Sequence, residues 1–416
     1  MTSVTALGHA RGEIIAFEDY LEHVLGNVVP LAPVEVGLAQ AAGLVTSEPA
    51  RALAPAPAFT NSAMDGFALN TADLPGSGKV RLPVSGDIPA GGKGTWTAGA
   101  AVRIMTGAPV PAGANTVIPV EFTDHPTTRA PAPKTVEVPG DWPADQNIRR
   151  AGSDIAGGEE ILPANTTLSG AALAGLAGVG VQRVRVWPKV RVGVIVTGDE
   201  VVTHNPGPSQ VLDSNSLLIT PAVTDFGGVV TRVRISSDDP LEFAAAFDDV
   251  APHVDLLLTT GGASVGAHDV ARHVLSGRGV EFVSVGIQPA KPQGFGVVDG
   301  VAVAALPGNP GAVHVSLHAI VRPILAHMGR VMVPAPEFKM VREGWKAREG
   351  MRQFVPVRID AGEIAPVIPG GVASHRVRSL AYADGLASVD PGVSSVEAGD
   401  VLPVIVTNPA ASPHRQ

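Results

Sequence analysis

Apolar side chains recur at helical spacing near the beginning of the chain. Over residues 17–42, Phe17, Leu21, Val24 and Leu25 fall on one face of a helix. The Pro-rich stretch at 49–57 ends this pattern, because proline lacks the N–H that a continuing helix needs. The spacing therefore predicts a helical segment over 17–42 and a domain boundary at the Pro-rich stretch.

The pattern then changes to short β-type runs separated by Gly and Pro turns, as at 79–84 and 116–122. Helical spacing resumes over 171–177, where Thr167 or Ser169 can cap a helix, and a β-like run follows at 181–187. The β module is thus expected to be an insertion. We predict an entry domain made of residues 14–51 and 148–187, interrupted by a β-rich lid domain at 52–147.

Residues 188–331 alternate β-like runs with helix-length segments, which is typical of a parallel α/β sheet. Asp213, Ser214 and Asn215 can begin one helix, and the last helix begins after Pro310. Residues 332–409 are rich in Val and Gly and predict a barrel-like β domain. The fold class is therefore multidomain, with a central doubly wound α/β domain whose strands are expected at 190–196, 229–235, 254–259, 281–285 and 301–306.

The amino-acid composition excludes several classes of partner and of active-site chemistry. The net charge is −9 and aromatic residues make up only 4% of the chain, which argues against nucleic acid as a partner. The absence of Cys excludes disulfides, thiolate metal sites and a thiol nucleophile. No basic segment followed by an apolar run marks a signal peptide, and no apolar stretch is long enough to span a membrane. We expect a cytoplasmic protein that binds no membrane.

Polar loops follow four of the expected strands. Glu200 follows the first strand, Asp238 and Asp239 follow the second, and Asp269 ends the Gly-rich loop after the third. In open α/β sheets the carboxyl ends of the strands form the ligand site. Gly-rich turns before helices favour phosphate, and carboxylates beside phosphate require a cation between them. The sequence therefore predicts a site for Mg²⁺ and phosphate, with Glu200, Asp238 or Asp239, and Asp269 as metal ligands.

The backbone and side chains of the same loops are the candidate substrate contacts. Each loop taken alone is also explained by ordinary turns and helix caps. Asp199 is better explained as a turn cap, and one of Asp238 and Asp239 as the cap of a helix that begins near Pro240. Taken together, the four loops favour a binding site that includes Thr197, Gly198, Asp213, Ser214, Gly261, Gly262, Ser264, Gly266, Pro307, Gly308 and Asn309.

His314 and His318 lie four residues apart on the expected last helix, a spacing that can place two metal ligands on one face. No Glu follows His314, so the H-E-x-x-H pattern of zinc hydrolases is missing. A partly exposed helix face explains the pair better than a zinc site does.

Eight segments, in order along most of the chain, resemble the molybdopterin molybdenumtransferases, of which the gephyrin E domain is the animal form. They are N-S-A-M-D-G-F-A at 61–68, I-M-T-G-A-P at 104–109, N-I-R-R-A-G at 147–152, T-G-D-E at 197–200, D-S-N at 213–215, G-G at 261–262, P-G-N-P at 307–310, and S-H at 374–375 ahead of A-D-G-L at 383–386.

This resemblance implies an elongated homodimer whose active sites combine the α/β domain of one subunit with the lid of the other. Asp65, Thr106 and Asp154 would then act from the second subunit. It also implies that the α/β domain is like that of the adenylyltransferase preceding it in the pathway. Molybdopterin adenylyltransferase and molybdoenzyme apoproteins are the further partners that it suggests.

The resemblance places molybdate against the 288–292 loop, the helix after Pro310 and the C-terminal domain. Lys291, Arg352 and Ser374 would be the anion contacts. The family pattern K-P-x-K-P becomes Q-P-A-K-P at 288–292, and Ala312 stands where a serine is usual. Because of Gln288 and Ala312, we expect weaker oxyanion binding than in a typical relative. Many relatives also carry Glu at the position of Ser153, and we do not interpret that difference as loss of function.

The activity implied is insertion of molybdenum from molybdate into adenylylated molybdopterin, with Mg²⁺ on the pyrophosphate and release of AMP. The order of metal insertion and AMP release stays open. Two alternatives remain: a scaffold that binds molybdopterin without turnover, and a paralogue that uses tungstate or has altered oxyanion affinity.

Overall fold

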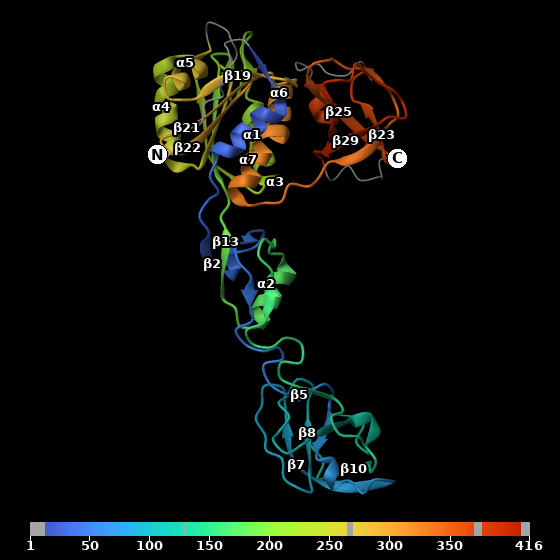
Figure 1. Cartoon of the computed structure of the whole chain (residues 1–416). Helices are drawn as coiled ribbons and strands as arrows, with labels where there is room; N and C mark the ends of the chain where they lie inside the picture. The colour runs from blue at the N-terminus through green and yellow to red at the C-terminus, as the bar shows by residue number, and fades with distance from the viewer. Residues whose placement is uncertain (1–12, 128–129, 264–268, 370–376, 409–416) are drawn as a thin grey trace. The chain divides into compact units, whose positions relative to one another are not determined.

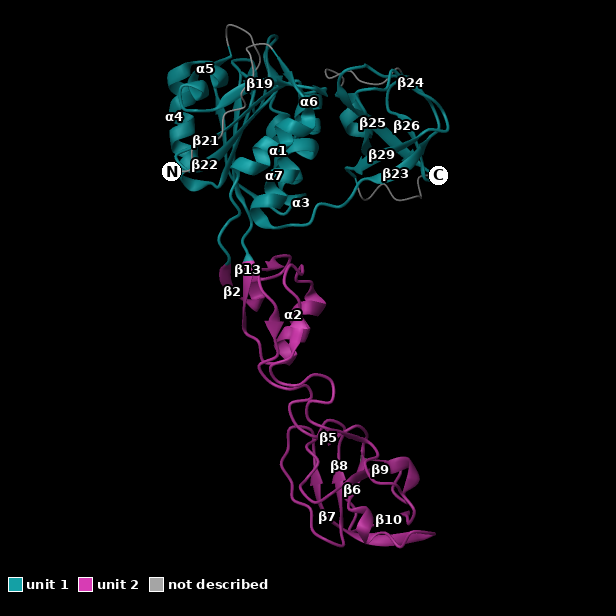
Figure 2. Cartoon of the chain, viewed as in Figure 1, with its two compact units in different colours: residues 1–33, 187–416 teal, residues 34–186 magenta. Residues whose placement is uncertain are grey.

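The computed structural model describes residues 13–127, 130–263, 269–369 and 377–408. The chain divides into two compact units (Figure 2). Unit 1 comprises residues up to Pro33 and from Trp187 onward, and unit 2 comprises Val34–Val186. Unit 2 is therefore inserted between an N-terminal segment of unit 1 and the rest of that unit.

A seven-stranded sheet forms the centre of unit 1. Four parallel neighbours, β22, β18, β14 and β17, were all expected from the sequence. The sequence missed β21, which runs antiparallel to both of its neighbours, because two glycines and a proline weaken its strand pattern. The strand order is β1 (Ile14–Ile15), β19 (Glu281–Val285), β21 (Pro292–Val298), β22 (Val301–Leu306), β18 (Leu256–Thr260), β14 (Arg191–Thr197) and β17 (Val229–Ser236).

Helices cover both faces of this sheet (Figure 1). Successive residues of a strand point to opposite faces, so Val194 packs in one core and Ile195 in the other. Helices α4 (Pro240–Val250) and α5 (Val270–Ser276) close the face of Ile195. The opposite face carries α1 (Phe17–Asn27), α3 (Asn215–Asp225), α6 (Pro310–Ser316), a π-helical turn (Leu317–Val321) and α7 (Arg322–Gly329). The doubly wound fold is confirmed.

The first helix is shorter than its spacing predicted. It ends at Asn27, and strand β2 (Val34–Gly37) begins after Pro30 and Pro33, so the prediction of a helical segment over 17–42 was wrong. Two prolines close together remove backbone donors and favour extended conformation before them. Tyr20 and Val24 of α1 are buried in the core of the α/β domain. Residues 14–33 therefore belong to unit 1, although the sequence had assigned them to the entry domain.

The described residues of unit 2 form three clusters of buried hydrophobic side chains. One lies beneath helix α2 (Gly170–Gly178), which Ser169 caps by accepting a hydrogen bond from the Ala172 N–H. Its strands are β2, β13 (Arg183–Trp187) and β3 (Val45–Thr46), with the short pair β4 (Ala50–Arg51) with β12 (Glu160–Leu162). The other two clusters pack on a five-stranded sheet in the order β10 (Thr135–Pro139), β7 (Lys79–Ile88), β8 (Ala101–Ile104), β6 (Gly66–Leu69) and β9 (Thr116–Pro119). Strand β5 (Asn61–Ser62) pairs with β11 (Ile148–Arg149), whose Ile148 packs against one of these two clusters.

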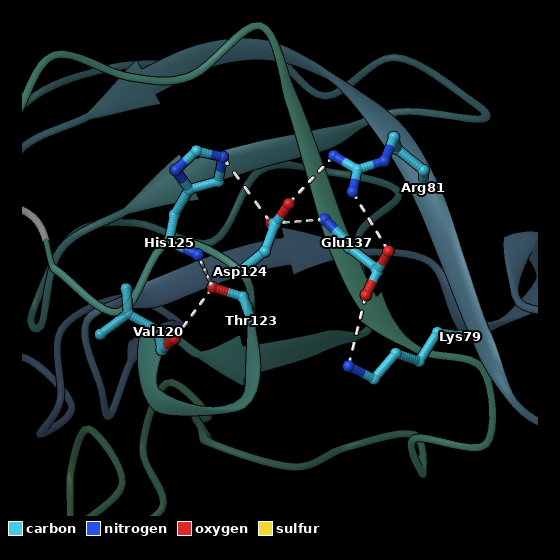
Figure 3. Close-up of polar contacts among 7 residues, drawn as sticks. All are labelled: Lys79, Arg81, Val120, Thr123, Asp124, His125 and Glu137. Carbon is cyan, nitrogen blue, oxygen red and sulfur yellow. Dashed lines mark hydrogen bonds and ion pairs between the residues drawn. The ribbon is translucent and has the colours of Figure 1, made fainter.

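Ion pairs hold the outer edge of that second sheet (Figure 3). The Arg81 guanidinium on β7 contacts Asp124 at 2.9 Å and Glu137 of β10 at 3.1 Å. Lys79 contacts the other Glu137 oxygen at 3.3 Å. The two basic side chains are more than half exposed, so each pair stabilises the fold by less than about 1 kcal/mol. We interpret this network as structural.

The C-terminal part of unit 1 is a closed five-stranded barrel. Strand β27 pairs with both β29 and β25, which closes the ring and leaves no free edge. A short strand of the α/β domain, β20 (Ile287–Gln288), pairs with β25. The barrel consists of β25 (Arg352–Asp360), β26 (Glu363–Pro366), β23 (Glu337–Val341), β29 (Val401–Val406) and β27 (Gly385–Val389), with β24 (Trp345–Lys346) paired to β28 (Ser395–Val396) and helix α8 (Arg378–Tyr382) beside them.

Among the described residues, no helix is both long and apolar enough to cross a membrane.

Candidate functional site

A cavity of about 510 Å³ lies at the carboxyl ends of β14, β18 and β22. The loops that leave these strands and the loop after β17 all contribute to its walls. Of the residues expected at the site, the structure brings together Thr197, Gly198, Glu200, Asp213, Ser214, Asp238, Gly261, Gly262, Asp269, Pro307, Gly308 and Asn309. Ser264, Gly266 and Ser374 lie outside the described residues.

Glycine at position 261 lets two of these loops approach. Gly261 has φ +94°, and a Cβ there would lie 2.2 Å from the Thr197 carbonyl oxygen. A Cβ on Gly308 would lie 3.2 Å from the Gly261 Cα. Backbone without side chains therefore forms this part of the wall, as close contact with a ligand's phosphate requires.

Asp238 and Asp239, which follow β17, have different roles. Asp239 caps α4, since its Oδ1 accepts hydrogen bonds from the N–H groups of Leu241 and Glu242. Asp238 lines the cavity instead, and its Oδ1 accepts a hydrogen bond from Thr197 Oγ1 at 3.2 Å. The structure therefore removes Asp239 from the candidate metal ligands, because its carboxylate is used by the helix.

Asp199 is a turn residue, as the sequence predicted. Its Oδ1 accepts a hydrogen bond from the Asp238 N–H at 3.0 Å, which joins the loops after β14 and β17. Glu200 bends back over Gly198, where a Cβ would lie 2.7 Å from Glu200 Oε2. The absence of a side chain at Gly198 thus makes room for the carboxylate that lines the cavity.

Helix α3 begins in the cavity wall. Asp213 caps its first turn, because its Oδ1 accepts a hydrogen bond from the Ser216 N–H at 3.0 Å. Ser214 lines the cavity without making a side-chain cap. The sequence predicted Asn215 as a helix start and as part of the D-S-N segment but not as a site residue, yet it lines the cavity and is 7% exposed.

The charge of the described cavity lining is negative. It includes Glu200, Asp213, Asp238 and Asp269, and it includes no Lys or Arg. Within the described ranges, no three His, Cys, Asp or Glu side chains are close enough to hold a metal ion by themselves. One or two carboxylates that share Mg²⁺ with a substrate phosphate fit this donor set better than an all-protein metal cage.

Of the expected molybdate contacts, the two that the structure describes, Lys291 and Arg352, do not line this cavity. Lys291 is exposed, although its neighbour Pro292 is part of the wall. Arg352 pairs with Glu18 at 2.7 Å and with Asp390 at 2.8 Å. Two carboxylates therefore already compensate the charge of the Arg352 guanidinium, and it is a weaker candidate for an anion contact than the sequence suggested.

The three residues expected from a second subunit lie in unit 2. The N–H and Oγ1 of Thr106 both donate to Asp65 Oδ1, each at 2.7 Å. The structure thus brings Asp65 and Thr106 together across 41 residues of sequence. Asp154 is exposed and lines a separate shallow cavity of unit 2.

A second cavity of unit 1, about 790 Å³, is lined by His314, His318 and residues of the barrel such as Ile359 and Ile405. The prediction of a partly exposed helix face was wrong, since His314 and His318 are 9% and 8% exposed. Their rings are 4.8 Å apart, and burial lowers the pKa of His314 to about 4 and that of His318 to about 2. We interpret them as neutral core residues.

Three family models match this chain in succession. The MoeA N-terminal region (domain I and II) matches residues 15–180, a probable molybdopterin binding domain matches 193–327, and the MoeA C-terminal region (domain IV) matches 340–407. The chain is 37% identical to molybdopterin molybdenumtransferase 2 of Mycobacterium tuberculosis over 390 residues, which cover 89% of this chain and 94% of the relative. This chain belongs to the molybdopterin molybdenumtransferase family.

Further relatives agree with this membership. The Haemophilus influenzae molybdopterin molybdenumtransferase is 34% identical over 70% of this chain and 72% of its own length. A crystal structure of a molybdopterin biosynthesis MoeA protein from Pyrococcus horikoshii matches with a TM-score of 0.81 at 26% identity, covering 95% of this chain and 99% of that one. Within this molybdenumtransferase-family chain, the matched segment 193–327 contains every described residue of the cavity lining.

The letters at 262–266, G-A-S-V-G, also match the G-x-S-x-G pattern of serine hydrolases. A serine nucleophile needs a histidine base within hydrogen-bond reach. The described part of the cavity lining contains no histidine. Family membership and the lining therefore favour molybdopterin chemistry over serine hydrolysis.

Proposed function

We propose that this chain inserts molybdenum from molybdate into adenylylated molybdopterin and releases AMP. The observation that carries the proposal is the cavity at the strand ends, where Gly261 and Gly262 expose backbone beside Glu200, Asp238 and Asp269. Exposed backbone N–H groups suit a pyrophosphate. Carboxylates in the same wall would repel it unless a cation lay between them.

We propose Mg²⁺ as that cation, held by one or two of the carboxylates of Glu200, Asp238 and Asp269 together with substrate oxygens. Bound there, Mg²⁺ would offset the charge that develops on the phosphate oxygens as the phosphoanhydride breaks. Thr197 orients the Asp238 carboxylate by donating to its Oδ1. The Gly-rich wall holds the substrate in place and keeps protein side chains away from the scissile bond.

In the overall reaction a molybdate oxygen forms a bond to the AMP phosphorus and the phosphoanhydride bond to the pterin phosphate breaks. Molybdenum bonds to the two dithiolene sulfurs as its bond to that oxygen breaks, so AMP leaves with the oxygen and the two thiol protons pass to solvent. Molybdate is already an oxyanion, so the reaction needs no general base from the protein to activate it. Lys291 is the remaining basic candidate for attracting molybdate from the 288–292 loop. An enzyme that adenylylates molybdopterin must supply the substrate, and apo-molybdoenzymes must consume the product.

Purified protein, adenylylated molybdopterin, Mg²⁺ and either molybdate or tungstate test this function directly. We expect AMP and metallated pterin to appear together with molybdate. AMP with tungstate alone would favour the tungstate paralogue. Release of no AMP with either oxyanion, despite binding of the pterin substrate, would support a scaffold and refute the proposed reaction.

We further propose a homodimer in which Asp65, Thr106 and Asp154 of one subunit complete the site of the other. Support comes from the family, and from the Asp65–Thr106 pair in unit 2. Mixing Asp65→Ala chains with Glu200→Ala chains should restore about a quarter of the full activity after random exchange, because half of the dimers are mixed and each has one intact site. Absence of recovery after verified exchange would place the site within one chain.

A further inference from the structure

Asn215 presents an unusual polar group to the cavity. It is the first residue of α3, it lines the cavity, and it is 7% exposed. Its Oδ1 is buried, and among the residues that the structure describes it has no hydrogen-bond partner. A buried acceptor without a partner is costly, so such a group at a binding site points to a contact that the ligand supplies.

The orientation of the Asn215 amide follows from its other contacts. Nδ2 lies 2.9 Å from the Gly308 carbonyl oxygen, which can only accept a hydrogen bond. Nδ2 also lies 2.9 Å from Thr260 Oγ1. The Thr260 hydroxyl donates its own hydrogen to the Pro307 carbonyl at 2.8 Å, so it accepts from Asn215. A flipped amide would place Oδ1 against two acceptors and is excluded.

The amide oxygen is therefore fixed as an acceptor at the cavity wall. A phosphate or molybdate oxygen at this point would oppose it, because both groups are acceptors. The ligand atom that satisfies Asn215 must instead carry a hydrogen. The nearby carboxylates are also acceptors and likewise require a ligand atom that carries a hydrogen. The glycine loops after β18 and β22 instead suit the anionic part of the substrate.

We propose that Asn215 Oδ1 selects an N–H donor on a heteroaromatic ring of the substrate and so sets which end of the substrate enters this part of the cavity. This inference rests on the proposed function. Two parts of adenylylated molybdopterin carry such donors: the 6-amino group of adenine and the amino and amide N–H groups of the pterin. Thr260 acts as a positioning residue, since it touches only Asn215 and the Pro307 backbone in this network.

The test compares wild type with Asn215→Leu and Asn215→Asp in the full-length chain. Leucine removes the acceptor, whereas aspartate keeps an acceptor toward the cavity and loses the donor to the Gly308 carbonyl and to Thr260 Oγ1. Thr220→Ala is the matched control, because Thr220 is an exposed residue of the same helix. Circular dichroism and thermal unfolding establish that each variant is folded.

The first arm measures the affinity of AMP relative to purine riboside 5′-monophosphate, which lacks the 6-amino group. If Asn215 contacts adenine, wild type, Asn215→Asp and Thr220→Ala prefer AMP by about tenfold, and Asn215→Leu loses that preference. The ratio of the two affinities separates the contribution of the 6-amino group from any general loss of nucleotide affinity. A purely structural role of Asn215 would affect both nucleotides equally.

The second arm measures the KM for adenylylated molybdopterin in the AMP-release assay. If wild type shows no preference between the two nucleotides and Asn215→Leu binds both as wild type does, an increase of about tenfold in this KM for Asn215→Leu but not for Asn215→Asp assigns the donor to the pterin. The inference is overturned if Asn215→Leu matches Thr220→Ala in both arms. The nucleotide arm needs no turnover. A wild-type chain that binds AMP but releases none therefore refutes the proposed reaction, while the nucleotide affinities still decide whether Asn215 contacts adenine.

Discussion

Two groups of segments in unit 1 were expected to carry charge for the reaction, and their charged side chains have different surroundings in the structure. The loops after β14, β17 and β18 place Glu200, Asp238 and Asp269 around one cavity. The 288–292 loop and the start of β25 instead leave Lys291 exposed and Arg352 paired with Glu18 and Asp390. Strand ends of a parallel sheet meet by topology, whereas contacts between the sheet and a separate barrel depend on side chains that no local pattern reveals.

The largest difference should appear between the two aspartates after β17. Asp238→Asn should lower the rate of AMP release at least about a hundredfold, because it removes a charge beside the scissile phosphate. Asp239→Ala should change that rate little and lower the free energy of unfolding by about 1 kcal/mol through loss of the α4 cap. Steady-state kinetics and urea unfolding of both variants check this contrast. Equal rates in the two variants would contradict the assignment of Asp238.

A side chain at position 261 should destabilise the fold, because it would fill the space between the loops after β14 and β18. Gly261→Ala places a methyl group 2.2 Å from the Thr197 carbonyl and adds strain at φ +94°. We expect a loss of at least about 2 kcal/mol in the free energy of unfolding. Gly76→Ala is the matched control, because Gly76 has φ +85° but nothing within 4 Å of its Cβ position. A loss no larger than that of the control would mean that the close approach does not matter.

The two buried histidines predict a dependence of stability on pH. Their folded pKa values lie below the ordinary 6.5, so the unfolded chain takes up protons first as the pH falls. Stability is then full above about pH 6.5 and falls by about 2 kcal/mol per histidine by about pH 5. His314→Leu and His318→Leu should each flatten this profile in thermal unfolding.

The exposed His253 provides the control for that experiment. His253→Gln should keep the slope of wild type between about pH 6.5 and pH 5. If His314→Leu and His318→Leu also keep the wild-type slope of stability against pH, then His314 and His318 are not neutral core residues.

The smallest expected effect concerns molybdate. Lys291→Ala should raise the molybdate concentration for half-maximal AMP release about tenfold, and Arg352→Ala should raise it less, since Arg352 is paired with two carboxylates. Gln288→Lys combined with Ala312→Ser should lower the molybdate concentration for half-maximal AMP release. Titration of AMP release with molybdate ranks the variants. A larger increase in that molybdate concentration for Arg352→Ala than for Lys291→Ala would contradict the ranking of these two basic residues.

Much of the fold followed from the sequence, because strand runs and their terminal loops carry local signals. Helix α1 was predicted too long because its apolar spacing continues past Pro30 into strand β2. The roles of Asp238 and Asp239 were separated only by hydrogen bonds to α4 and to Thr197. Asn215 depends on Gly308, 93 residues away, and no pattern within α3 reveals that contact.

The most direct test of the central claim is the rate of AMP release from adenylylated molybdopterin as a function of Mg²⁺ concentration, at saturating molybdate, in wild type and Asp238→Asn. We predict that wild type loses activity when the divalent cation is chelated and regains it with Mg²⁺. We also predict that Asp238→Asn needs at least about tenfold more Mg²⁺ for its residual rate. Release of AMP by wild type at the same rate without any divalent cation would contradict a magnesium-dependent transfer at this cavity.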